Sequence, residues 1–249
     1  MKVAALLYHD VVGEEGFAAS GFPGGDADIY KLRREAFAAH LDAVRAVDPP
    51  ARRVIFTFDD GGVGAHRHDA AMLEERGWRG SFFIATDWIG KAGFMDAGQL
   101  RDLHARGHVV GSHSCSHPTR MSSLPADRVL AEWRDSRRRL EEILGAPVAD
   151  GSVPAGFYSP RVAAIAFEAG LTTLYNSEPT GTVRQVAGGT VVGRYSIMRD
   201  DPPSLPAAFA AGARLPELRQ AVLWNAKKAV KAIGGEYWLA FRRRVLATR

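Results

Sequence analysis

Short apolar runs alternate along this chain with longer stretches whose apolar residues recur at helical spacing. The run Val54-Ile55-Phe56-Thr57-Phe58 is typical of the first kind, because it is rich in β-branched and aromatic residues. Runs of this length between polar or glycine-containing segments predict buried strands. The predicted strands are residues 3–8, 54–58, 81–85, 108–112, a short strand at 153, 171–175 and 190–195.

Helical periodicity is clearest where Leu32, Phe37, Leu41 and Val44 fall on one face. Similar stretches elsewhere are followed by a glycine, which favours the end of a helix. The predicted helices are residues 32–47, 66–76, 96–106, 126–144 and 159–169. The longest is heavily charged, and we interpret its charged face as exposed to solvent. Strands joined by helices indicate an α/β fold, namely a distorted (β/α) barrel, complete or incomplete, with about seven parallel strands.

Two polar segments follow directly on predicted strands. Asp59 and Asp60 follow one of them, and His113 and His117 follow another. In (β/α) barrels the C-terminal ends of the strands form the rim that carries the chemistry. Two imidazoles and a carboxylate can hold a divalent metal, and a second carboxylate can take a proton from water. A helical turn after His113 would bring His117 to the same side, with Asp60 as third ligand and Asp59 free as general base.

Each segment also has a purely local interpretation. Asp59 and Asp60 with the two glycines that follow can form a simple turn, and the two histidines can serve as local hydrogen-bonding groups. Either pattern alone is common by chance. Their joint occurrence, each directly after an apolar strand, favours a metal site.

The two segments together resemble the motifs of a known family. Thr57-Phe58-Asp59-Asp60-Gly61 is similar to the Thr-Phe-Asp-Asp-Gly motif of the polysaccharide deacetylases of carbohydrate esterase family 4, which include nodulation-type chitooligosaccharide deacetylases. The segment from His113 to His117 is similar to their His-Ser/Thr-x-x-His motif. The resemblance implies a distorted (β/α) barrel that binds a divalent metal, usually Zn²⁺, with Co²⁺, Ni²⁺ or Mn²⁺ as alternatives. It implies Asp59 as base and Asp60, His113 and His117 as metal ligands. The implied reaction is hydrolysis of an N-acetyl amide, or occasionally an ester, on a sugar.

One family motif is altered here. The Arg-x-Pro-aromatic-Gly segment, which supplies a backbone donor to the oxyanion, corresponds to Ser152-Val153-Pro154-Ala155-Gly156. Pro154 and Gly156 are kept, and the Ala155 N–H can still serve because a backbone donor does not depend on its side chain. The family's arginine, which orients the base, is replaced by serine. Arg161 and Arg194 are the candidates for its role.

The family's usual general acid, a late histidine, is also missing, since no histidine follows His117. His9, which follows the first predicted strand, is the candidate for a catalytic contribution. The alternative for His9 is a structural role in which it pairs with Asp10. Trp88 and Tyr158 are candidates for contacts with a sugar, Trp88 by stacking.

Two other functions remain open at this point. The altered motif and the missing histidine leave room for a metal-dependent amidase or deformylase that acts on a non-glycan substrate. A non-catalytic glycan-binding relative is the third hypothesis, but a purely structural metal site has no use for the unligated Asp59.

Composition and charge divide the chain into two parts. With 249 residues, 46% of them hydrophobic, it can bury a full core, and one domain over residues 1–203 is expected. The net charge of +4 is uneven, because residues 205–249 hold nine basic and two acidic residues. We expect residues 204–249 to be a basic helical extension with amphipathic stretches at 218–230 and 237–246. The single cysteine, Cys115, excludes an internal disulfide.

The extension has the pattern of a membrane-surface helix, with packing on the barrel as the alternative. No nucleic-acid recognition motif accompanies the charges, so we expect no nucleic-acid partner. The chain shows no apolar stretch of spanning length and no signal-peptide pattern, and we expect a cytoplasmic location, peripheral to the inner face of the membrane. An N-acetylated sugar or lipid-linked glycan intermediate of cell-surface polysaccharide synthesis is the expected substrate.

Overall fold

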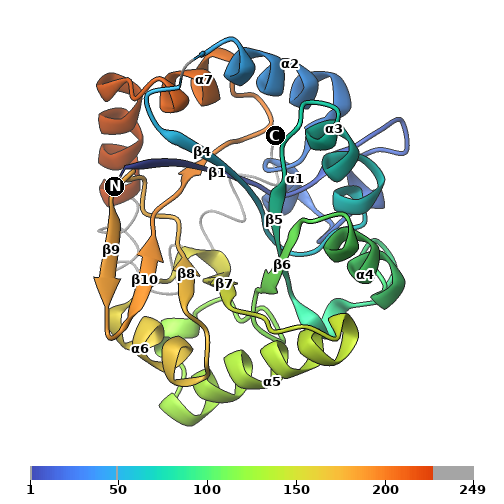
Figure 1. Cartoon of the computed structure of the whole chain (residues 1–249), viewed down its shortest axis with the longest axis vertical. Helices are drawn as coiled ribbons and strands as arrows, with labels where there is room; N and C mark the ends of the chain where they lie inside the picture. The colour runs from blue at the N-terminus through green and yellow to red at the C-terminus, as the bar shows by residue number, and fades with distance from the viewer. Residues whose placement is uncertain (1, 49, 227–249) are drawn as a thin grey trace.

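A curled, mostly parallel sheet organises the computed structural model, which describes residues 2–48 and 50–226 (Figure 1). Neighbouring strands in this sheet are parallel, except that the edge strand β9 runs antiparallel to β10. In sheet order the strands are β11 (Tyr195–Ser196), β1 (Val3–Tyr8), β4 (Arg53–Phe58), β5 (Gly80–Ile84), β6 (Val109–Ser112), β7 (Asp150–Ser152), β8 (Thr173–Tyr175), β10 (Gly189–Val192) and β9 (Val183–Val186). A separate small sheet pairs β2 (Val11–Val12) with β3 (Leu32–Arg33). The predicted (β/α) barrel is confirmed in an incomplete form. The sequence did not predict β2, β3 and β9, and the short strand expected at 153 ends at Ser152.

The gap in the barrel is bridged by the chain itself. β10 pairs with β8 near one end of the strand order, and β11 pairs with β1 at the other end. The two residues between β10 and β11 therefore connect the two ends of the curled sheet. These residues are Gly193 and Arg194. A side chain at Gly193 would place its Cβ 2.5 Å from the Glu178 carbonyl oxygen, so the crossing requires glycine. The single strand predicted for residues 190–195 is therefore wrong in one respect, because it is broken at this crossing.

Helices surround the outside of the sheet (Figure 1). The predicted helices are confirmed, with two differences. The helix predicted for 66–76 begins as a π-helix, and residues 32–33 of the helix predicted for 32–47 form β3 instead. The helices are α2 (Arg34–Arg45), the π-helix Ala65–Asp69 with α3 (Ala70–Glu74), α4 (Ala97–Ala105), α5 (Ala126–Leu144), α6 (Pro160–Glu168) and α7 (Ser204–Ala210), with a short α1 (Gly25–Asp28) in the first long loop. An Asp96–Gln99 capping box starts α4, and Gly145 ends α5 with a φ of 65°. None of the described helices is long and apolar enough to cross a bilayer.

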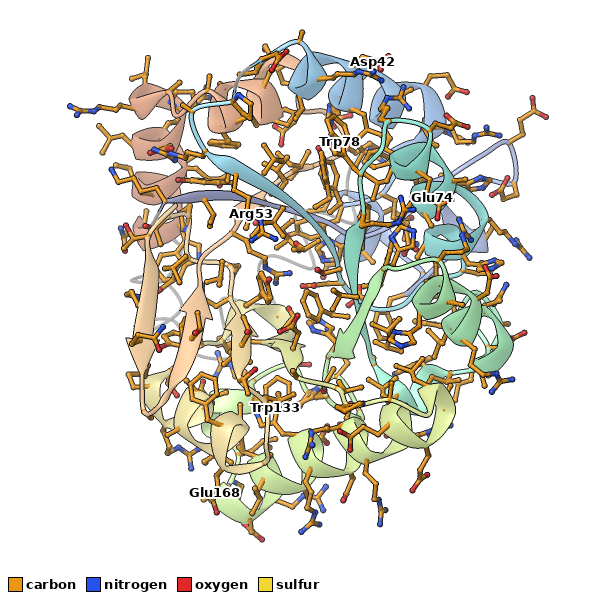
Figure 2. The ribbon with its side chains drawn as sticks, viewed as in Figure 1. Asp42, Arg53, Glu74, Trp78, Trp133 and Glu168 are labelled. Atoms are coloured by element: carbon orange, nitrogen blue, oxygen red, sulfur yellow. The ribbon has the colours of Figure 1, made fainter. Side chains whose placement is uncertain are left out.

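The core lies on both faces of the sheet. Outer positions such as Phe56, Phe58 and Phe82 pack under the helices, and Trp133 points from α5 toward the sheet (Figure 2). Alternate positions form a smaller cluster that includes Val3, Ala5, Phe83, Tyr175 and Val192. Because side chains alternate along a strand, Thr57 and Asp59 continue the inward row of β4. The base predicted from the sequence is thereby placed inside the mouth of the barrel.

Part of the predicted extension packs against the barrel. Phe209 of α7 is fully buried and stacks on Tyr195 at a centroid distance of 4.2 Å. Residues 214–226 are helical, with Glu217 paired to Arg52 and the Gln220 amide donating to the Ser196 carbonyl at 2.8 Å. The amphipathic stretch predicted for 237–246, and the end of that predicted for 218–230, lie outside the described residues.

Candidate active site

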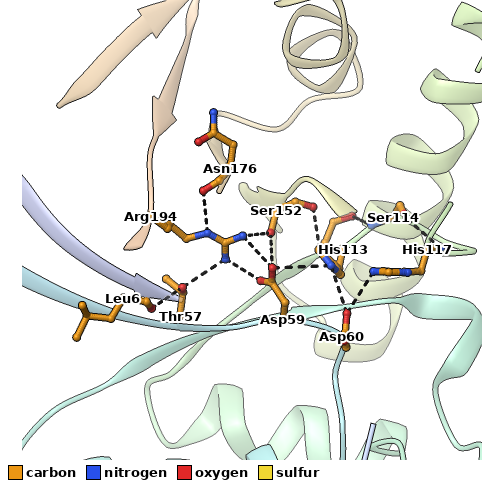
Figure 3. A network of polar contacts seen from close by, with 11 residues as sticks. Leu6, Thr57, Asp59, Asp60, His113, Ser114, His117, Ser152, Asn176 and Arg194 are labelled. Carbon is orange, nitrogen blue, oxygen red and sulfur yellow. Dashed lines mark hydrogen bonds and ion pairs between the residues drawn. The ribbon is translucent and has the colours of Figure 1, made fainter. Parts of the chain in front are cut away.

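Asp59 lies directly after β4 in a cradle of hydrogen-bond donors. Its carboxylate accepts two hydrogen bonds from the Arg194 guanidinium, at 2.7 and 2.8 Å, and one from the Ser152 hydroxyl at 3.1 Å. Arg194 also donates to Ser152, to Thr57 and, through Nε, to the Asn176 carbonyl (Figure 3). Both Asp59 and Arg194 are nearly fully buried. This bidentate arrangement fixes the position of the carboxylate.

The charge of Asp59 is maintained despite its burial. Burial alone would raise the pKa of this carboxyl, but the guanidinium of Arg194, by its charge and its hydrogen bonds, holds the pKa below its ordinary value. Asp59 is therefore an ionised, aligned carboxylate at neutral pH. Arg194 places a guanidinium on Asp59 where the altered motif has none, whereas Arg161 donates to the carbonyl oxygens of Ser122 and Leu124 instead. Of the two alternatives, Arg194 is the arginine that contacts Asp59.

Asp60, His113 and His117 form a cluster of metal-ligating atoms in which every atom lies within 4.8 Å of the others. Asp60 Oδ1 lies 3.5 Å from His113 Nε2 and 3.3 Å from His117 Nε2, and it accepts no hydrogen bond from any described residue. His113 Nδ1 lies 2.9 Å from the Ser152 carbonyl oxygen, to which it can donate, leaving the Nε2 lone pair directed at Asp60. A buried acceptor facing two imidazole nitrogens is the arrangement expected around a cation.

The two flanking imidazoles also affect charge in this cluster. Burial would raise the pKa of the Asp60 carboxyl, but His113 and His117 lower it well below the ordinary value. Burial would lower the pKa of His117, and the Asp60 carboxylate raises it instead. Both shifts have one cause, because the buried carboxylate and the imidazole beside it each stabilise the charged form of the other.

The histidine segment is not the helical turn considered from the sequence. Ser114 and His117 adopt left-handed backbone conformations, with φ of 65° and 57°. Glu132 of α5 holds this turn, since its carboxylate accepts from the N–H groups of Cys115 and Ser116, both at 2.9 Å, and from the Ser116 hydroxyl at 2.7 Å. This non-helical turn brings the His113 and His117 side chains together, as the helical turn was expected to do. Glu132 is buried, so the charged face of α5 is not wholly exposed to solvent.

His9 lies beside the same cluster, after β1. Its ring stacks on Tyr30 at a centroid distance of 4.6 Å, and Nδ1 is buried without a hydrogen bond in the part of the chain that is described. Burial lowers the pKa of His9, and the negative charges of Asp60 and Asp59 act against that shift. Asp10 accepts a hydrogen bond from Ser20 at 2.7 Å, so the structure provides no support for the alternative pairing of His9 with Asp10.

The remaining predicted residues lie around the rim. Pro154, Ala155 and Gly156 form a 3₁₀ turn after β7, with Ala155 exposed at a φ of 53° and Gly156 at 69°. Tyr158 follows this turn and is half-buried. Trp88 packs edge-on against Phe22 at 4.8 Å, and Phe22 in turn lies 5.0 Å from the His117 ring. Trp88 is thus separated from the cluster by one aromatic ring.

Sequence reasoning missed several residues that build this site. Asn176, whose carbonyl oxygen accepts from Arg194, follows directly on β8, where a polar residue is a usable signal. Glu132 carried a clearer signal, since it lies between Val129 and Ser136 on the buried stripe of α5. A carboxylate on an apolar stripe needs a partner.

Three comparisons relate this chain to known proteins. A chitin deacetylase from Colletotrichum lindemuthianum is 25% identical over 129 residues, which cover 51% of each chain. IcaB from Ammonifex degensii superimposes with a TM-score of 0.66 at 23% identity, covering 84% of this chain and 96% of the other. A polysaccharide deacetylase from Bacillus cereus gives a TM-score of 0.69 at 15% identity, covering 84% and 69%. At these identities the structural matches show the fold.

The curated relatives are matched over only part of their length, namely 66%, 5% and 51% of the first three. The family itself is shown by a match that is independent of any single relative. Residues 46–174, slightly more than half of the chain, match the model of the polysaccharide deacetylases, and they contain Asp59, Asp60, His113 and His117. This chain therefore belongs to the polysaccharide deacetylase family, carbohydrate esterase family 4.

Proposed function

We propose that this protein is a metal-dependent hydrolase that removes N-acetyl groups from a glycan. The observation that carries the proposal is the separation of roles between two adjacent carboxylates. Asp60 lies between the two histidines, whereas Asp59 is paired in a bidentate manner with Arg194, and its Oδ2 lies 3.9 Å from His113 Nε2. One carboxylate is available to a cation and the other to a proton.

The residues present fit a divalent metal. Asp60 Oδ1 is a buried acceptor without a donor among the described residues, and the two Nε2 atoms point toward it. Two imidazoles and one carboxylate suit Zn²⁺, with Co²⁺, Ni²⁺ or Mn²⁺ as alternatives. A divalent ion held there would supply Lewis-acid chemistry, polarising the acetyl carbonyl and lowering the pKa of water.

Asp59 is the proposed general base. Its pKa lies below the ordinary value, so it is unprotonated and ready to accept a proton from water at neutral pH. Arg194 is a positioning residue that keeps the carboxylate aligned through two parallel hydrogen bonds. The Ala155 N–H, in the turn between Pro154 and Gly156, is the proposed donor to the tetrahedral oxyanion.

His9 is the proposed general acid for the leaving amine. The charges of both Asp59 and Asp60 act on it, and its buried Nδ1 has no protein partner in the described range. His9→Gln should slow amide hydrolysis by about 10²-fold or more. It should slow hydrolysis of an activated aryl acetate far less, because that leaving group needs no proton. Equal losses on both substrates would contradict the assignment.

Metal content and acetate release together test the main proposal. Protein purified without chelator or histidine tag should contain about one zinc per chain, and His113→Ala/His117→Ala should contain none. Asp59→Asn should keep the metal and lose acetate release from N-acetylated glycans. If Asp59→Asn retained full activity, the base assignment would be wrong. If wild-type protein released formate or another acyl group, but no acetate, the glycan deacetylase proposal would give way to a non-glycan amidase.

We further propose peripheral contact with an anionic membrane, such as the inner face of the cytoplasmic membrane, and a lipid-linked glycan as substrate. Leu215, Leu218 and Val222 follow one another at helical spacing and are 78%, 63% and 59% exposed. Basic residues flank and follow them in the sequence. Leu218→Ser/Val222→Ser should weaken binding to vesicles containing phosphatidylglycerol, measured by co-sedimentation at low salt. Equal partition of the wild type and the variant would refute the membrane contact.

A further inference from the structure

A cavity of about 390 Å³ lies on the outside of the barrel, and its volume is within the range of small-molecule sites. Its lining comes from residues Lys2 and Arg52 just before β1 and β4, from the segment 179–182 before β9, and from the helix of residues 214–226 (Figure 1). Tyr195 of β11 is also part of it. The cavity therefore lies between this helix and the two ends of the curled sheet.

This cavity is remote from the catalytic rim. Arg52 directly precedes β4, whereas Asp59 directly follows it. The strand has six residues, and at about 3.3 Å per residue it separates its two ends by roughly 20 Å. A sugar that reacts at Asp59 lies at the opposite end of the strand, so the cavity is a site of its own and not part of the substrate site.

Arg52 is a fixed guanidinium in the wall of this cavity. Its side chain is only 9% exposed, and Nη1 pairs with Glu217 and donates to the Tyr195 hydroxyl at 3.1 Å. The backbone approaches it closely, since a Cβ at Gly181 would lie 2.9 Å from Nη1 and a Cβ at Gly212 would lie 3.3 Å from Nε. Among the described residues, neither Nε nor Nη2 has an acceptor. An arginine held in place with donors to spare is suited to bind an anion.

The charge of the lining is positive. Lys2 and Arg214 are exposed, and neither forms an ion pair within residues 2–48 and 50–226. Together with Arg52 they place three positive charges around the cavity, and Glu217 is the only carboxylate in the described lining. The lining therefore carries a net charge of +2, which favours a ligand with two negative charges.

The remaining lining supplies a hydroxyl group and an apolar wall. Thr180 Oγ1 accepts from the Thr182 N–H at 3.2 Å, so the Thr180 hydroxyl can still donate its proton to a ligand. Leu218 and Ala221 lie three residues apart on the helix, which places them on the same face, toward the cavity. Leu218 is 63% exposed, so the cavity opens along an apolar edge. Such an edge suits the organic part of a charged molecule.

We propose that this cavity binds a phosphoryl group carried on an organic molecule, that is, a phosphate monoester or a diphosphate, away from the catalytic site. Two negative charges match the lining, and the guanidinium groups of Arg52 and Arg214 can each bind two phosphate oxygens. The carrier is a soluble ester or a lipid headgroup, which present the same group. The inference does not depend on the proposed activity.

Calorimetric titration with phenyl phosphate tests the site in zinc-loaded, full-length protein at low salt. Lys2→Ala and Arg214→Ala should each weaken binding about fivefold or more, because each removes one charge-assisted contact. Arg219→Ala is the matched control, since it removes the same charge from an exposed position on the same helix that does not line the cavity. It should change the affinity less than twofold. Binding should persist in His113→Ala/His117→Ala protein, because the metal is not the proposed site.

The outcomes are distinct. Absence of saturable binding, loss of binding in His113→Ala/His117→Ala protein, or an affinity that Lys2→Ala and Arg214→Ala leave unchanged would overturn the site. Because Lys2 and Arg214 are exposed, their removal should not unfold the protein. Co-sedimentation with phosphatidylcholine vesicles then distinguishes the carriers. Binding that requires phosphatidic acid and is reversed by phenyl phosphate identifies a lipid headgroup, whereas phenyl phosphate binding without vesicle binding identifies a soluble ester. None of these measurements involves acetate release, so failure of the proposed activity would leave the result intact.

Discussion

Arg194 offers the sharpest test of the site, because one side chain holds the base, the Ser152 hydroxyl and the Asn176 carbonyl. Its two hydrogen bonds to Asp59 are charge-assisted, and such bonds contribute about 1.5–3 kcal/mol each. Removing one partner of a buried ion pair typically costs about 3–5 kcal/mol. We expect Arg194→Ala to lower the free energy of unfolding by about 4 kcal/mol, a loss that a domain with about 5–15 kcal/mol can survive.

Arg194→Lys separates positioning from charge. Lysine keeps the positive charge but cannot make two parallel bonds, so Asp59 should be displaced from its alignment. If the misaligned carboxylate stabilises the transition state by about 2 kcal/mol less, kcat should fall roughly 30-fold with little change in KM. Weaker pairing should also raise the pKa of Asp59, which moves the acid limb of the rate profile toward higher pH. The assay is acetate release between pH 4 and 9, with circular dichroism to confirm folding.

Two further variants test whether Arg194, and not Arg161, positions Asp59. Arg161→Lys, at the other arginine that the sequence suggested, should leave kcat and the pH profile unchanged. In Arg194→Ala protein, adding Ser152→Arg should restore part of the activity, because it returns a guanidinium from the strand that carries it in the family motif. If Arg194→Lys had wild-type kcat and an unshifted acid limb, the claim that bidentate pairing positions the base would be wrong.

Three further predictions address the supports of the site. Glu132→Gln should weaken zinc affinity by about 10–100-fold without unfolding the protein, because the turn that carries His117 loses its charged hydrogen-bond acceptor. Chelator competition measures this affinity, and an unchanged value would mean that other contacts hold the turn. Burial raises the pKa of Asp10 from 3.8 to about 7, so the folded state binds an extra proton between these values. The free energy of unfolding from urea titrations should therefore decline as pH rises from about 4 to 7, and Asp10→Asn should flatten this decline. Gly193→Ala should lower stability by about 1–3 kcal/mol by thermal melting, because its Cβ would meet the Glu178 carbonyl, and a neutral result would show that the crossing can relax.

The sequence predicted those parts of the site that local patterns determine. Asp59, Asp60, His113 and His117 each follow an apolar strand, and the ends of parallel strands must meet at one rim. Arg194 could not be distinguished from Arg161 in the same way. Its contact with Asp59 spans 135 residues and depends on how the sheet curls, which no local pattern encodes.

The backbone conformation of the turn from His113 to His117 could not be predicted from local sequence either. Left-handed φ values at Ser114 and His117 have no strong residue signal, and they are stabilised from outside by Glu132. The edge strand β9 was missed for a related reason. Its residues are only partly buried, so its apolar pattern is weak, and its existence depends on pairing with β10.

The crossing between β10 and β11 has a consequence for the order in which the protein matures. Chains emerge from the ribosome with the N-terminus first, so Asp59 is synthesised 135 residues before its counter-charge. Until the crossing docks, enclosing that carboxylate without its partner would cost several kcal/mol, which disfavours closing the barrel around it. The segment that closes the gap in the sheet thus also brings in the counter-charge of Asp59, and a chain that ended before residue 194 would leave this carboxylate without its guanidinium partner.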